Sequence, residues 1–588
     1  MFKSSSWAVA GLVAASLGLA GCNGKKAEAP ADLVLTHGTV YTVNDQNAVV
    51  QAVAVRNGAI VFVGTDAGAK AFIGPKTKVE DLGGKAVFPG FTDSHVHLPD
   101  GGAGIRGLAL GSIMDVKTVL ADVKAYADAN PDLPVIFGAG WELSLFPDAN
   151  PSKALLDAIV PDRPVVLGAA DGHNSWVNTK ALELAGITKD TKDPINGHIE
   201  HDADGNPSGT LREAAQALVM SIVPQPTEED AEKNIEAGMH FQLSNGITSS
   251  IDAAIMADQN EAAYLKLSEN PDLPQRMRVC LLAAKAMVTS VVTPENAAET
   301  VKELDARRAQ YRKHAKDRLN AECVKIFVDG VYENHTAAMI DPYVNAAEGP
   351  EYRGRPNLSP EALDAYVTDL DADGFQVHMH AIGDRAVRMA LDAVEAAEKA
   401  NGPKDRRHQI AHLEIVRPED IKHFKPLNVT ADLQTLWHFA DEYITDLTVP
   451  FLQKDLQRWI YPAKSFKDAG ARIVWGSDWP VSTSDPFQSM EVAVTRQDPN
   501  ADPAKSEPPL VPEEALTVDD MIQALTRGGA YLMNQENIRG SLEVGKRGDM
   551  IIVDHDPYKV KPVDIGSIKV LETFIDGKTV FKRKAADS

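Results

Sequence analysis

Hydrophobic and polar residues alternate at both ends of the chain. Residues 33–64 contain four short apolar runs separated by hairpin-type pairs such as His37-Gly38 and Asn57-Gly58. Alternation with a period of two residues is typical of half-buried strands, and Asn-Gly pairs favour tight turns. Residues 549–554 and 570–575 show the same pattern. We therefore predict that residues 33–86 and 538–583 pair into one composite β-sandwich.

The middle of the chain alternates apolar strand-like runs with segments of helical spacing. Ser359-Pro360-Glu361 is a helix start, and Leu363, Val367 and Leu370 follow at helical intervals. Strands that alternate with helices favour a parallel sheet. We count eight strand candidates, at residues 86–97, 246–252, 277–282, 323–328, 375–380, 408–412, 429–433 and 472–478. The fold class expected for residues 87–537 is therefore α/β, a TIM (β/α)8 barrel. A long insertion at about 105–235 is expected to form a lid subdomain.

The first residues differ from the rest. Residues 1–21 have a positive start and a short apolar run, as in a signal peptide, and they end in Leu-Ala-Gly before Cys22. This string resembles a bacterial lipobox, so we expect lipidation of Cys22 and a tether over residues 22–32. An ordinary secretory signal is the alternative. The expected location is the bacterial cell envelope, with the protein lipid-anchored at the outer membrane or on the periplasmic face.

Composition narrows the possible partners. The 588 residues carry a formal net charge of −24, and no basic stripe stands out, so nucleic acid is not an expected partner. We expect a small-molecule substrate and membrane contact only through the anchor, and we leave a homodimer open. Cys280 and Cys323 remain in the mature chain. We expect two buried free thiols, with a bridge as the alternative.

Metal-capable residues stand at the ends of the predicted barrel strands. In a TIM barrel these ends meet at one face, which carries the active site. His95 and His97 are two residues apart, so in a strand their side chains point the same way. The complete set is His95, His97, Lys325, His380, His412 and Asp478. His378 has the same strand parity as His380, and His408 the same as His412, so these deeper positions are alternatives.

The motifs around these residues resemble the amidohydrolase superfamily of metal-dependent hydrolases. They read PGFTDSHVHL, VKIFVDG, HMHAIGDRAV, QIAHLE, WGSDWPV and GSLEVGKRGDMIIVD, and they span almost the whole mature chain. The chain is most similar to amidohydrolase family 3, the branch that includes N-substituted formamide deformylases.

The resemblance implies a role for each residue. His95 and His97 would hold one divalent ion, His380 and His412 a second, and a carboxylated Lys325 would bridge them. Asp478 would contact the first ion and act as the catalytic general acid/base for attack by a metal-activated hydroxide. Zinc suits these donors. Alternatively, only one ion binds and Lys325 neutralises Asp329 or Asp478.

Substrate contacts are expected in the insertion and in the strand-end loops. The candidates are Trp141, Glu142, His173, Arg212, Asp329, Trp437 and Trp479. Packing is the alternative for each aromatic residue. The segment from Val331 to Thr336 departs from the Ser- and Gly-rich stretch of the family, which leaves the substrate open.

The expected function is hydrolysis of a non-peptide C–N bond, in an amide or an N-acyl or N-formyl compound. An ester or lactone hydrolase and a deaminase are alternatives, since the same kind of site serves all of them. A ligand-binding surface lipoprotein without activity is the remote alternative. It would be expected to have lost a ligand residue, and this chain has all six.

Overall fold

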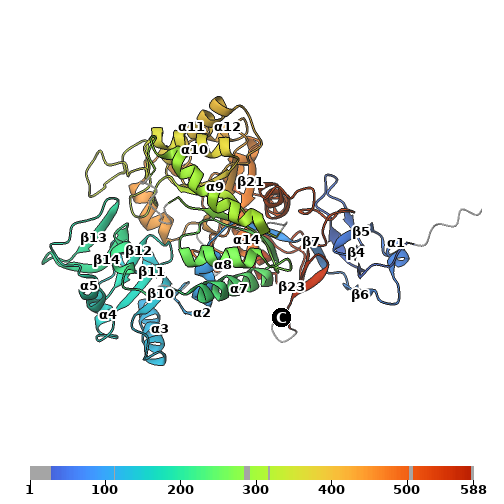
Figure 1. Cartoon of the computed structure of the whole chain (residues 1–588), viewed down its shortest axis with the longest axis horizontal. Helices are drawn as coiled ribbons and strands as arrows, with labels where there is room; N and C mark the ends of the chain where they lie inside the picture. Colours follow the sequence, from blue (N-terminus) through green and yellow to red (C-terminus); the bar gives the residue numbers. More distant parts are fainter. Residues whose placement is uncertain are drawn as a thin grey trace, which may run out of the picture.

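The computed structural model describes residues 28–111, 113–224, 226–283, 292–314, 318–501 and 508–584. Within this part of the chain the strands form four sheets. Figure 1 shows the largest sheet and its helices at the centre, the sheet that contains β10–β14 on the left, and the sheets that contain β7 and β4 on the right. The predicted signal peptide and Cys22 lie outside the described residues, so lipidation stays a prediction. None of the described helices is long and apolar enough to span a membrane.

The central sheet has eight parallel strands in the order β21-β20-β19-β18-β17-β16-β15-β8. The last strand returns to the first through a parallel bridge between Val96 and Trp479, so the barrel is nearly closed. This arrangement confirms the predicted α/β class with a TIM-like barrel. The strands are β8 (Phe91–Val96), β15 (Ile247–Asp252), β16 (Arg276–Leu281), β17 (Leu319–Phe327), β18 (Gln376–Ala381), β19 (Gln409–His412), β20 (Thr430–Leu433) and β21 (Arg472–Trp475).

Helices cover the outside of the barrel (Figure 1). Their starts follow from the sequence: the Ser359 side chain accepts a hydrogen bond from the Ala362 amide, and Thr227 forms a capping box with Asp230. The main helices are α2 (Leu98–Arg106), α7 (Glu228–Ser244), α8 (Asp258–Ser268), α9 (Ala297–His314), α10 (Pro360–Asp373), α11 (Asp384–Asn401), α12 (Pro418–Phe424), α13 (Ala463–Asp468), α14 (Pro486–Thr495) and α15 (Val518–Gln523).

The segment between β8 and β15 builds a sheet of its own, in the order β13-β14-β12-β11-β10-β9. Trp141 and Trp176 are fully buried in its hydrophobic core. The elements are β9 (Leu108–Ala109), α3 (Val116–Ala129), β10 (Ile136–Trp141), α4 (Lys153–Asp157), β11 (Val165–Ala169), β12 (Asn174–Val177), α5 (Thr179–Ala185), β13 (Gly197–His201), β14 (Pro207–Glu213) and α6 (Gln216–Met220).

The two ends of the chain meet in one sheet, in the order β24-β23-β22-β7-β2-β3, where β22 pairs antiparallel with β7. A further sheet, in the order β5-β4-β1-β6, lies at the N-terminal end. The strands are β1 (Leu33–Thr36), β2 (Thr39–Tyr41), β3 (Val49–Val50), β4 (Ala52–Arg56), β5 (Ala59–Gly64), β6 (Lys78–Asp81), β7 (Ala86–Pro89), β22 (Met550–Val553), β23 (Val570–Ile575) and β24 (Lys578–Lys582).

Cys280 and Cys323 form a disulfide, so the expectation of two free thiols is wrong. The two residues are direct partners in the parallel ladder between β16 and β17, with Cα atoms 4.3 Å apart. Partners on adjacent strands place their side chains side by side on the same face, within bridging range. The register of two strands joined by a helical connection decides this pairing, and the sequence leaves that register open.

Candidate metal-dependent active site

The first and last barrel strands bring three predicted ligands together. The Asp478 amide donates to the His95 carbonyl at 2.7 Å, and the His97 amide donates to the Trp479 carbonyl at 2.9 Å. These backbone bonds fix the strand ends side by side. As a result, Asp478 Oδ1 lies 3.2 Å from His97 Nε2 and 3.5 Å from His95 Nε2.

Lys325 and His412 complete a compact donor cluster. Lys325 Nζ lies 3.1 Å from His95 Nε2, and His412 Nδ1 lies 3.9 Å from Asp478 Oδ2. One donor atom each of His95, His412 and Asp478 lies within 4.8 Å of the others. His412 Nδ1 and Asp478 Oδ1 are buried and have no hydrogen-bond partner in the described structure. Buried polar atoms normally have a partner, so this cluster fits a cation.

His380 lies next to this cluster, with its ring centroid 4.5 Å from that of His412. Its Nε2 lies 3.0 Å from the Gly330 carbonyl, which accepts the proton of that nitrogen. Nδ1 is therefore the nitrogen left to coordinate an ion. A backbone carbonyl that fixes the other ring nitrogen is a common arrangement for a metal-binding histidine.

The surroundings keep most of the cluster histidines neutral, as metal ligation requires. Burial, followed by the charge of Lys325, holds the pKa of His95 well below its usual range. The pKa values of His380 and His412 are also well below that range, first because of burial. His97 differs, because the nearby Asp478 carboxylate outweighs burial and raises the pKa of His97.

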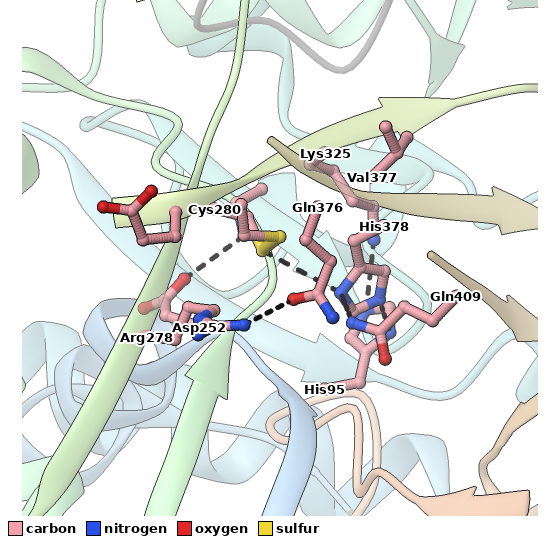
Figure 2. The surroundings of a disulfide bond; sticks show 12 residues. His95, Asp252, Arg278, Cys280, Lys325, Gln376, Val377, His378 and Gln409 are labelled. Carbon is pink, nitrogen blue, oxygen red and sulfur yellow. Dashed lines mark hydrogen bonds between the residues drawn. A yellow bond between two sulfur atoms is a disulfide. The ribbon is translucent and has the colours of Figure 1, made fainter. Parts of the chain in front are cut away.

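A second layer of polar residues lies behind the ligands (Figure 2). His378 Nε2 lies 2.9 Å from His95 Nδ1, and Gln409 Nε2 lies 2.7 Å from His378 Nδ1. The sulfur of Cys280 lies 3.9 Å from the same His378 nitrogen. His378 therefore holds His95 from the interior of the barrel, whereas His380 lines the cavity. Strand parity alone does not separate these two roles.

Two buried aspartates of this layer escaped the sequence reasoning. Asp93 accepts hydrogen bonds from the Ser477 amide at 2.9 Å and from Gln242 Nε2 at 3.0 Å. Asp432 accepts from Ser94 Oγ at 2.9 Å. Both are fully buried within barrel strands, and burial raises the pKa of Asp93 to about 7. The only sequence signal for them is an acidic residue inside an apolar strand.

A cavity of about 270 Å³ opens onto the cluster. Lys325, His380, His412 and Asp478 line it. Of the predicted substrate contacts, Glu142, His173 and Trp437 also line it. The Trp437 ring stacks on His412 with centroids 5.5 Å apart. His173 Nδ1 lies 2.8 Å from Glu213 Oε2, and this pairing outweighs burial to raise the pKa of His173 to about 9.

The other four predicted contacts do not line this cavity. Trp141 is fully buried in the core of the insertion and donates to the Leu167 carbonyl. Arg212 pairs with Glu200, and Trp479 packs on Phe241 with ring centroids 4.9 Å apart. Asp329 accepts hydrogen bonds from the amides of Ala338, Ile382 and Gly383, and so fixes the turn after His380. All four side chains make contacts within the protein. These contacts could not be predicted from the positions of the residues near sequence motifs.

The chain is similar in sequence to known proteins over most of its length. The protein LONG AFTER FAR-RED 3 of Arabidopsis thaliana is 30% identical over 560 residues, covering 94% of this chain and 92% of that protein. The N-substituted formamide deformylase of Arthrobacter pascens is 26% identical, covering 94% of this chain and 98% of the enzyme.

Solved structures share the fold. An uncharacterized metal-dependent hydrolase from Pyrococcus horikoshii OT3 superimposes with a TM-score of 0.69 at 24% identity, covering 90% of this chain and 99% of that one. The model of the amidohydrolase family matches residues 78–581, a range that contains every residue of the donor cluster. The chain therefore belongs to the amidohydrolase family of metal-dependent hydrolases.

Proposed function

We propose that the protein hydrolyses a non-peptide C–N bond, in an amide or an N-acyl or N-formyl compound. The observation that carries this proposal is the buried donor cluster of His95, His97, His412 and Asp478, with unsatisfied atoms, beside a cavity of small-molecule size. A cavity with a few converging polar groups is the usual form of a small-molecule site. The formamide deformylase relative supports the choice of bond.

The residues present fit a divalent cation, and zinc is the ion that we propose. His95, His97 and Asp478 would hold one ion, and His380 and His412 a second. A bound ion of this kind acts as a Lewis acid and lowers the pKa of water toward neutrality. Nitrogen and carboxylate oxygen donors suit zinc.

Lys325 is the proposed bridge, as a carboxylated side chain. It is fully buried, and burial lowers the pKa of its amine to about 8 against the attraction of Asp478. A lower pKa increases the neutral fraction, and only the neutral amine reacts with carbon dioxide. An unmodified Lys325 ammonium in a metal-loaded crystal structure would contradict the bridge.

Two side chains act on protons in the proposed reaction. Asp478 accepts a proton from the attacking water and delivers it to the leaving nitrogen, as a general acid/base. Protonated His173, held by Glu213, faces the cavity and donates a hydrogen bond to the polarised substrate oxygen.

The test combines a substrate panel with the variant Asp478→Asn. We expect the metal-loaded protein to hydrolyse N-formyl or N-acyl amines. Asp478→Asn should lose this activity by about 10²-fold or more, since the amide cannot transfer the proton. The variant should keep most of its metal, measured by elemental analysis, because the histidines remain.

Exposed Asp446→Asn is the control and should retain wild-type rates. Full activity in Asp478→Asn would contradict the mechanism. Turnover of esters or amidines without turnover of amides would contradict the proposed bond.

A further inference from the structure

The active-site cavity is strongly acidic. Of the described side chains that line it, seven are carboxylates, one is a lysine and none is an arginine. The carboxylates are Glu142, Asp171, Glu333, Glu414, Asp441, Asp478 and Asp498. Asp478 belongs to the donor cluster. The other six carboxylates lie outside that cluster.

Three of these carboxylates form a group that we call the acidic wall: Glu333, Glu414 and Asp441. They stand in the loops after strands β17, β19 and β20, at the end of the barrel that carries the donor cluster. None of the three forms an ion pair with any lysine, arginine or histidine in the described part of the chain. No ion pair therefore neutralises them in this part of the chain.

Glu414 points independently to a ligand. It is only 1% exposed and lines the cavity, yet a single side-chain hydrogen bond reaches it, from Thr448 Oγ1 to Oε1 at 3.3 Å. Its second oxygen, Oε2, accepts no hydrogen bond from the residues that the structure describes. Glu414 is a buried residue that lines the cavity, so this unpaired oxygen is suited to a donor that enters the cavity.

The electrostatics of the other two residues agree. Burial raises the pKa of Glu333 to about 7 and, together with the charge of Glu333, that of Asp441 to about 8. Each carboxylate would be stabilised by a positive group. The charge of His173 lowers the pKa of Glu333 only in part, because His173 is paired with Glu213.

Aromatic rings complete this side of the cavity. Trp437, Phe439, Tyr443 and Tyr461 line it together with the acidic wall. Aromatic faces attract cations, and carboxylates beside them add charge and hydrogen-bond acceptors. This combination is suited to an alkylammonium or arylalkylammonium group, whereas it repels an anionic substrate.

We propose that the substrate carries a positively charged amine, which the acidic wall and the aromatic rings bind while its amide lies at the donor cluster. This inference rests on the proposed function, and it names the class of substrate: the N-acyl or N-formyl derivative of a compound with a second, protonated amine. Hydrogen bonds to charged partners contribute about 1.5–3 kcal/mol each, which corresponds to a preference of about tenfold or more.

The first experiment compares two substrates of equal length on the metal-loaded enzyme, N-formyl-1,4-diaminobutane and N-formylpentylamine. We expect kcat/KM to be about tenfold higher or more for the charged compound. Asp441→Asn should reduce this ratio severalfold. Asp446→Asn lies in the same segment but is exposed, and it should keep the ratio. Equal kcat/KM values for the two substrates, or a ratio that Asp441→Asn leaves unchanged, would overturn the inference.

A binding experiment separates failure of the inference from failure of the proposed function. Isothermal titration calorimetry measures benzylammonium, with benzyl alcohol as the neutral control. Preferential binding of benzylammonium that Asp441→Asn weakens would support the cation site even if no amide were hydrolysed. Hydrolysis of the neutral formamide, with equal binding of the two probes, would leave the function standing and overturn the cation site.

Discussion

At the residue scale, Gly476, which follows β21, allows His95 and Asp432 to pack closely against the end of this strand. A Cβ atom on Gly476 would lie 2.6 Å from the Cβ atom of His95 and 2.8 Å from Asp432 Oδ1. Such distances are too short for packed atoms, so His95 would have to shift. We predict that Gly476→Ala lowers the metal content per chain and lowers kcat, because small displacements of a ligand cost affinity.

Elemental analysis after dialysis measures this loss. Gly104→Ala serves as the control, because a Cβ atom there meets nothing within 4 Å. Wild-type metal content in Gly476→Ala would show that the strand end tolerates the extra methyl group.

The convergence of the predicted metal ligands was the most predictable feature of the site. His95, His97, Lys325, His412 and Asp478 converge because each lies at or near the carboxyl end of a parallel strand, which the apolar runs indicate. What the sequence could not show is which polar residues lie behind them. His378 and His380 have the same strand parity and differ in their depth in the barrel. That depth depends on the strand register, which the sequence does not give.

At the scale of elements, the helix that follows His97 packs unusually close to its neighbour. Gly102 on α2 lies against α7, and a Cβ atom there would lie 1.8 Å from the Asn234 carbonyl oxygen. We predict that Gly102→Ala destabilises the protein by about 1–3 kcal/mol or more, because backbone atoms cannot move aside easily. Thermal unfolding should show a lower apparent Tm.

Gly104→Ala in the same helix is the matched control. Alanine is the better helix former and finds open space there, so its Tm should stay level or rise slightly. Equal Tm values for the two variants would contradict close packing between α2 and α7.

The barrel strands themselves were predictable to within a few residues, because each is an apolar run between turn signals. β8 and β17 are the exceptions. β8 begins at Phe91, five positions after the expected start, because residues 86–89 form β7 in another sheet. β17 begins at Leu319, four positions before the expected start. The alternating residues Asn320 and Glu322 hide this extension. The disulfide between β16 and β17 and the depth of Trp141 depend on packing between segments, which local patterns do not encode.

At the scale of the whole molecule, a buried ion pair joins the barrel to the C-terminal segment. Arg276 of β16 is fully buried, and its Nε lies 2.7 Å from Asp549 Oδ2, just before β22. We predict that Asp549→Ala destabilises the protein by about 3 kcal/mol, because it leaves a buried charge with one fewer partner. Asp576, 2.7 Å from Arg276, limits the loss.

Thermal unfolding and limited proteolysis of the C-terminal segment measure this effect. Asp45→Ala is the control, because its ion pair with Arg527 is largely exposed and should contribute less than about 1 kcal/mol. A Tm in Asp549→Ala as high as in Asp45→Ala would contradict a stabilising role for the buried pair.

The bonds between the first and last barrel strands also have a kinetic consequence. Asp93 and Ser477 are 384 positions apart, and the backbone of His95 meets that of Asp478 only when β21 is in place. Contacts of such long sequence separation form slowly, because a large loop must close first. The ion-binding cluster is thus completed late in folding. Metal uptake during refolding should follow barrel closure. A nascent chain cannot assemble this cluster until β21 and the Asp478 that follows it have been synthesised.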